Sequence, residues 1–108
     1  MAPASQPGLA LDAATLAAVS DICRRFQVRR LDMVGSATRA DFDPARSDVD
    51  LLVDFEPEAR IGLFAYVAFA DAMEVLFGRH VDLLSGKSLR NPVLRRAVEA
   101  DRRPLYPR

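Results

Sequence analysis

The segment from Asp48 to Phe55 constrains the fold more than any other part of the sequence. Its residues alternate between two sets, as they do along a strand, where successive side chains point to opposite faces of the sheet. The first set comprises Val49, Leu51, Val53 and Phe55, and the second comprises Asp48, Asp50, Leu52 and Asp54. The pattern predicts a strand with one apolar face and one face that carries carboxylates.

Helical and extended segments alternate along the rest of the chain. The predicted order is a helix at 13–27 with Asp12 as its N-cap, a strand at 29–34, a short helix starting at 37–40, a loop at 41–47, the strand 48–55, a helix at 61–77, a strand at 80–85 and a final helix opened by Asn91 and Pro92. This order predicts an α/β (α+β) fold with helices packed on a small mixed sheet. A chain of 108 residues has room for one core, so we expect a single domain at 9–108 behind a disordered lead-in at 1–8.

The helix at 61–77 is unusual because only Asp71 and Glu74 are charged between Gly62 and Phe77. A helix on the surface of a small domain normally keeps about half of its circumference polar. We expect the sheet to cover Leu63, Tyr66, Val67, Ala70, Met73 and Phe77, and to leave bare Phe64, Ala65, Ala68, Ala72 and Val75. The bare side predicts an association surface, used either for a homodimer or for a heteromer.

Composition excludes several classes of protein. The formal net charge is zero, which argues against direct binding of nucleic acid through bulk electrostatics. No apolar run approaches the roughly 20 residues that cross a membrane. Cys23 is alone among apolar neighbours, which predicts a buried thiol and a reducing cytoplasm. From Gly86 onward, seven basic residues face two acidic ones, so this tail is either a solvated helix face or a contact for an acidic partner or a triphosphate.

Asp48 and Asp50 are candidate ligands for a metal ion. On a strand, carboxylates two residues apart leave the same face with Cα atoms about 6.5–7 Å apart, and a divalent ion relieves their repulsion. Oxygen ligands at this spacing suit Mg²⁺. The alternative is that Asp48 caps a turn and Asp50 faces solvent from an edge strand. Asp82 lies in a second short apolar strand, and it joins the same face if the two strands pair.

Gly35 and Ser36 stand where a strand passes into a helix, a place where backbone can approach a phosphate closely. Together with the acids they carry a family resemblance. Val34-Gly35-Ser36-Ala37-Thr38-Arg39, then Ser47-Asp48-Val49-Asp50-Leu51-Leu52-Val53, then Val81-Asp82-Leu83-Leu84 resembles the minimal nucleotidyltransferase (MNT) family of the DNA polymerase β superfamily. The resemblance extends through 89–92 to Leu105 and Tyr106.

The resemblance implies roles for the matched residues. Gly35 and Ser36 would hold the β- and γ-phosphates of ATP, and Arg39 would lie near the triphosphate, unless it is an ordinary surface arginine. Asp48, Asp50 and Asp82 would bind Mg²⁺, and Asp82 would also help to activate the acceptor hydroxyl. The chain departs from the family in having one residue more than usual between Ser36 and Asp48, so the loop at 41–47 must run differently. The family's usual glycine after Arg39 is also replaced, by Ala40. His80 either touches substrate or is a partly exposed histidine at a strand end.

The resemblance also implies a partner. Small members of the family act with a HEPN-domain ribonuclease toxin, to which they transfer AMP on a tyrosine, and so serve as antitoxins. We expect that activity here. Two alternatives stay open at this point: a non-catalytic module that occludes its partner, and an adenylyltransferase that acts on a small-molecule hydroxyl.

Overall fold

A computed structural model of the chain describes residues 9–35, 48–85 and 89–107. The elements in chain order are α1 (Ala13–Arg25), β1 (Val28–Val34), β2 (Val49–Phe55), α2 (Leu63–Phe77), β3 (Val81–Leu84), α3 (Pro92–Ala100) and β4 (Arg103–Tyr106). The α/β prediction is confirmed. The lead-in at 1–8, the short helix start at 37–40 and the loop at 41–47 lie outside the described residues.

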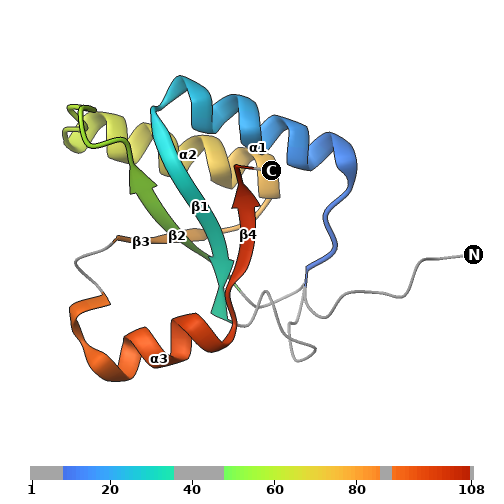
Figure 1. Cartoon of the computed structure of the whole chain (residues 1–108). Coiled ribbons are helices and arrows are strands. Elements are labelled where there is room, and N and C mark those ends of the chain that lie inside the picture. The colour runs from blue at the N-terminus through green and yellow to red at the C-terminus, as the bar shows by residue number, and fades with distance from the viewer. Residues whose placement is uncertain (1–8, 36–47, 86–88, 108) are drawn as a thin grey trace, which may run out of the picture.

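Within the described residues the sheet has four strands in the order β3-β2-β1-β4. β1 is antiparallel to both of its neighbours, whereas β2 and β3 are parallel, so the sheet is mixed. α1 and α2 cover one face, and α3 lies against the other (Figure 1). The sheet therefore has two different environments, one on each side.

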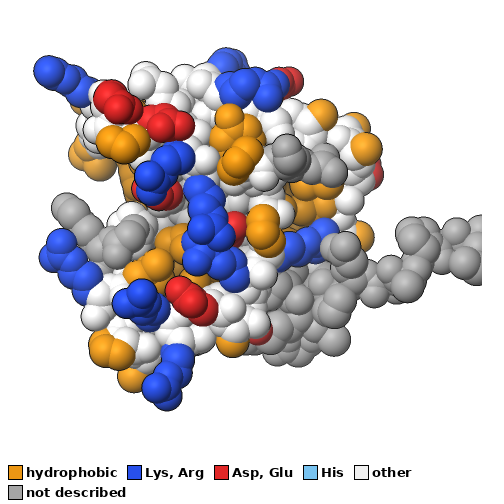
Figure 2. Space-filling view, in the orientation of Figure 1, with side chains coloured by type: hydrophobic (Ala, Val, Ile, Leu, Met, Phe, Trp, Pro, Cys, Tyr) orange, Lys and Arg blue, Asp and Glu red, His pale blue; other side chains and the backbone are white. Residues whose placement is uncertain are grey.

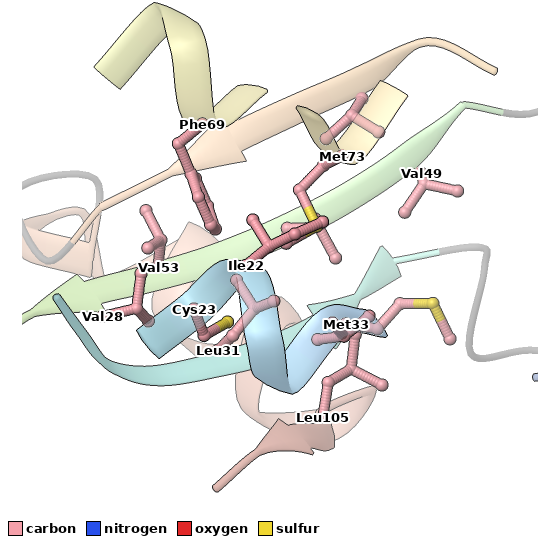
Figure 3. Packing of buried hydrophobic residues seen from close by; sticks show 13 residues of the cluster. Ile22, Cys23, Val28, Leu31, Met33, Val49, Val53, Phe69, Met73 and Leu105 are labelled. Carbon is pink, nitrogen blue, oxygen red and sulfur yellow. The ribbon is translucent and has the colours of Figure 1, made fainter. Parts of the chain in front are cut away.

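The face under α1 and α2 carries the main core (Figure 3). As the alternation predicts, Val49, Leu51 and Val53 of β2 are buried in it, and Phe55 packs against it. Phe69 of α2 meets Phe26 and Phe55 with ring centroids 5.5 and 5.8 Å apart. These edge-to-face contacts fix α2 over the sheet.

The start of α1 confirms its predicted cap. The Asp12 carboxylate accepts a hydrogen bond of 2.7 Å from the backbone N–H of Thr15. Hydrogen bonds from the side chain and then the backbone of Thr15 lower the pKa of Asp12. Cys23 is buried as expected, and burial raises the pKa of its thiol to about 12. The helix ends at Arg25, two residues before the predicted end, because Gln27 takes a positive φ of 59° that no helix can continue.

The exposed side of α2 differs in part from its prediction. Phe64 and Val75 are bare, as expected, with 92 and 84% of their surface exposed. Leu63 and Val67, expected on the sheet, are exposed as well, and Ala72, expected bare, packs against the core. Met73 is fully buried as expected, together with Phe69, which the prediction did not place. A helix that is apolar almost all round has no polar stripe to indicate which side faces solvent. The packing of the large Phe69 ring against Phe26 and Phe55 sets the orientation of the helix.

β4 is a strand that the sequence prediction lacks. It pairs with β1 at the edge of the sheet and buries Leu105. A four-residue segment that contains Pro104 gives little strand signal, because proline cannot donate to a ladder. An edge position tolerates it.

Candidate active site

Three acids converge on the face of the sheet that α3 covers in part. In the parallel pairing of β2 with β3, Asp50 is the direct neighbour of Asp82, as Val49 is of Val81. Neighbours in register point to the same face, so the predicted juxtaposition of Asp50 and Asp82 is confirmed. β2 lies between β1 and β3, which contradicts the alternative in which Asp50 faces solvent from an edge strand.

Asp48 completes the cluster from the residue before β2. Ligand atoms of Asp48, His80 and Asp82 all lie within 4.8 Å of one another. Asp48 and Asp82 are exposed, whereas Asp50 is half-buried. The cluster is open to solvent on one side, which a nucleotide and a metal ion require.

The electrostatics of the cluster disfavour three bare charges. Burial raises the pKa of the Asp50 carboxyl, and the charges of Asp82 and Asp48 raise it further. A cation bound among these oxygens would lower the repulsion, and hard carboxylate oxygens are the ligands that Mg²⁺ prefers. The residues present therefore fit a magnesium site.

Gly35 closes the site from the end of β1. Its φ is +72°, a value that glycine adopts without strain, and a Cβ built on it would lie 2.7 Å from Oδ2 of Asp50. The register of β1 with β2 explains the proximity, because Val34 pairs with Asp50. Ser36 and Arg39, the other predicted nucleotide contacts, lie outside the described residues, so their roles stay predictions.

Both ring nitrogens of His80 contact carboxylates. Its Nε2 lies 2.9 Å from Oδ1 of Asp82, and its Nδ1 lies 2.9 Å from Oε2 of Glu74. The hydrogen bond to Asp82 and the charge of that residue raise the pKa of His80. Glu74 has no role in the sequence prediction, although an acid on so apolar a helix is a signal of one.

A second polar group lies on the same face, farther along β1. Asp32 is fully buried and accepts from Nε of Arg102 at 2.6 Å and from Nε of Arg30 at 3.0 Å. Removing one partner of such a pair would leave a buried charge uncompensated. The group ties the segment before β4 to the centre of the sheet, and it is structural.

Basic side chains gather over α3 and β4 in the view of Figure 2. A groove along α3 is lined by Leu89, Arg90, Pro92, Arg95, Arg96 and Glu99. Arg90, Arg95 and Arg96 of the predicted basic tail are thus exposed on the α3 side of the sheet, whereas Arg102 and Arg103 are half-buried. Val98 packs inward from α3, whereas the side chains of Leu94 and Ala97 lie outside the described residues.

Comparison with known proteins identifies the family of the chain. A model of the nucleotidyltransferase domain matches residues 17–105. The chain belongs to the nucleotidyltransferase domain family. Its class of reaction is therefore transfer of a nucleotidyl group. No helix in the described ranges is long and apolar enough to span a membrane.

Individual relatives agree with the family. The chain is 34% identical to the protein adenylyltransferase MntA of Thermococcus cleftensis over 68% of its own length and 71% of that protein. It is 26% identical to a Methanocaldococcus jannaschii protein, provisionally named a protein adenylyltransferase, over 81% of its own length and 94% of that protein.

Two solved structures share the fold. One, provisionally described as a minimal nucleotidyltransferase, is 33% identical and superimposes with a TM-score of 0.67 over 85% of this chain and 89% of that one. The other is a crystal structure of a toxin–antitoxin with AMP-PNP, 18% identical, with a TM-score of 0.61 over 86% of this chain and 73% of that one. The first confirms the minimal nucleotidyltransferase fold that the motifs predict.

Proposed function

We propose that this nucleotidyltransferase transfers AMP from ATP to a hydroxyl group in the presence of Mg²⁺. The acceptor is a tyrosine of a HEPN-type ribonuclease toxin, and the chain is its antitoxin in a reducing cytoplasm. The observation that carries the proposal is the in-register pair of Asp50 and Asp82, with Asp48 beside them and Gly35 against Asp50.

The site residues divide the work of the transfer. Asp48, Asp50 and Asp82 would hold Mg²⁺, which when bound neutralises phosphate charge and polarises the phosphoryl group. Gly35 and Ser36 would bind the β- and γ-phosphates, with Arg39 near them. The acceptor oxygen bonds to the α-phosphorus while the bond from that phosphorus to the bridging oxygen of the β-phosphate breaks, so pyrophosphate leaves. Asp82 accepts the hydroxyl proton.

A protein acceptor is supported by the names of relatives and by the exposed side of α2. MntA is named a protein adenylyltransferase, and the AMP-PNP complex is a toxin–antitoxin. Phe64 and Val75 on α2 offer an apolar surface of the kind that partners cover. A neighbouring gene that encodes a HEPN-like chain with an Arg-x₄-His motif would identify the toxin.

Calorimetric titration with ATP, with and without Mg²⁺, tests the site. We expect binding that depends on the metal and is lost in the double variant Asp48→Ala with Asp50→Ala. Asp54→Ala, on the same strand but outside the cluster, is the matched control and should bind like the parent. Unchanged binding by the double variant would refute the site assignment.

Stoichiometric occlusion of a partner is the second candidate, and the bare apolar side chains of α2 favour it. Radiolabel from [α-³²P]ATP on the co-purified toxin separates the two candidates. Transfer predicts label on a toxin tyrosine that disappears with the double variant. Occlusion predicts no label and a double variant that still neutralises the toxin in cells.

A further inference from the structure

His80 and Glu74 form a chain of contacts that ends at the active site. α2 ends at Phe77, and its C-cap Gly78, with a φ of 69°, starts the turn into β3. This turn brings His80 back beside the last turn of α2, where Nδ1 lies 2.9 Å from Oε2 of Glu74. The same Glu74 oxygen accepts a 3.1 Å hydrogen bond from the backbone N–H of Val81. Glu74 therefore holds both the imidazole and the first residue of β3.

The other end of the imidazole holds a site carboxylate. Nε2 of His80 lies 2.9 Å from Oδ1 of Asp82. Asp82 is exposed and would otherwise turn freely about its side-chain bonds. With Oδ1 engaged by His80, the carboxylate is held in one orientation. Groups that hold metal ligands in this way commonly set the affinity of the metal, although they do not touch it.

We propose that His80 is a positioning residue that fixes the Asp82 carboxylate for the metal ion, and that Glu74 orients His80 from α2. This inference rests on the proposed function, because it takes Asp82 as a metal ligand. Both ring nitrogens already face carboxylates, and Mg²⁺ prefers oxygen to nitrogen. His80 therefore acts on the metal through Asp82.

Binding of Mn²⁺ to the nucleotide-free protein, followed by electron paramagnetic resonance, tests the inference without relying on activity. We expect His80→Ala to weaken Mn²⁺ binding about 10- to 100-fold. Glu74→Ala should weaken it in the same direction by a smaller factor. Asp71→Ala removes an exposed acid one helical turn before Glu74 and should bind Mn²⁺ like the parent.

Two further measurements separate positioning from other roles. His80→Gln keeps a side-chain N–H donor and should recover part of the affinity lost in His80→Ala, with thermal unfolding temperatures close to that of the parent. Pulsed resonance of the Mn²⁺ complex should show no coupling to a directly bound imidazole nitrogen. Such a coupling would make His80 a ligand and overturn the proposal.

Asp82→Ala distinguishes failure of this inference from failure of the proposed function. If Asp82→Ala loses Mn²⁺ and His80→Ala keeps it, the positioning role alone is wrong. If Asp82→Ala binds Mn²⁺ like the parent, the metal site is wrong and the positioning role falls with it.

Discussion

The two faces of the sheet differ in how much apolar surface they bury and in the charged side chains they carry. The face under α1 and α2 buries a continuous set of apolar side chains, including Leu31, Leu51 and Phe69. The face toward α3 buries a much smaller set, Val34, Leu52 and Val98, and carries the site acids beside it. Both faces belong to the same strands.

The difference separates stability from chemistry. Apolar burial stabilises the fold in proportion to the area removed from water, and most of that area lies under α1 and α2. Clustered carboxylates oppose folding, because burial and mutual repulsion raise the pKa of Asp50. One face can therefore carry an unfavourable site because the other holds the domain together.

Leu51 and Leu52 give the most direct test of the comparison, since they are adjacent on β2 and point to opposite faces. Leu51 is fully buried in the main core, and Leu52 is 4% exposed in the smaller cluster. Leucine-to-alanine changes in cores cost about 2–5 kcal/mol, and more where the surroundings cannot relax. We expect Leu51→Ala near the upper end and Leu52→Ala near the lower end in urea unfolding. Equal costs would mean that the two faces stabilise the fold alike.

Asp50→Asn should lower the activity of the protein while raising its stability, and so separate these two properties in one residue. If Asp50 holds Mg²⁺ as proposed, Asp50→Asn should lower the rate of AMP transfer from labelled ATP by on the order of 10²–10³-fold, because the amide binds the cation less strongly. The metal-free variant should nevertheless melt at a higher temperature than the parent at pH 7, because the amide carries no charge to repel Asp82 and Asp48.

The stability difference between Asp50→Asn and the parent should depend on pH. The carboxyl of Asp50 has a higher pKa when folded, so the folded chain binds the proton more tightly than the unfolded chain. Its ionised form therefore costs stability above the folded pKa, and the cost disappears as pH falls below the unfolded pKa. The advantage of Asp50→Asn over the parent should shrink over that fall, measured by thermal melts with chelator present. An advantage that is constant with pH would exclude repulsion as its cause.

Phe64→Asp tests whether the outer side of α2 serves association. Phe64 is almost fully exposed in the single chain, so the change should barely alter stability. Burying a Phe side chain contributes roughly 1.5–3 kcal/mol. Replacing Phe64 by a charged residue in an apolar interface should therefore weaken self-association or partner binding by at least about tenfold. Sedimentation at several concentrations measures it, and Ala14→Asp on exposed α1 surface is the control. A strictly monomeric parent whose variant binds a co-expressed partner equally well would contradict the prediction.

The reactivity of the Cys23 thiol measures whether the main core stays closed, without any substitution. Burial raises the pKa of its thiol to about 12, so little reactive thiolate forms at pH 8. We expect negligible alkylation by iodoacetamide in the native protein and complete alkylation in urea. Rapid native alkylation would show that α1 opens readily from the sheet.

Local patterns predicted the parts of the fold that depend on local physics. The alternation in β2 and the cap at Asp12 involve neighbours in sequence, and both are present as expected. The pairing of Asp50 with Asp82 followed from two short strands that each carry acids on an apolar background. The roles of these residues, and of Ser36 and Arg39, remain predictions.

The features missing from the sequence prediction depend on contacts that no local sequence pattern records. Asp32 alternates with Leu31 and Met33 like a surface residue, yet Arg102 from 70 positions away makes its burial possible. The rotation of α2 is set by the ring of Phe69 against Phe26 and Phe55. Glu74 and His80 meet only because the turn at Gly78 reverses the chain. None of these contacts leaves a periodic trace in the sequence.

The parallel pairing of β2 with β3 also determines when the site can exist during synthesis. Asp50 and Asp82 are 32 positions apart, and their contact requires that the crossover through α2 be complete. Non-local parallel pairing forms slowly, because the loop must close before its contacts stabilise it. A growing chain thus emerges from the ribosome with Gly35, Asp48 and Asp50 long before their third acid. If the acids bind Mg²⁺ as proposed, only a chain that has completed this crossover can bind it, and a nascent fragment that ends before β3 has an incomplete site.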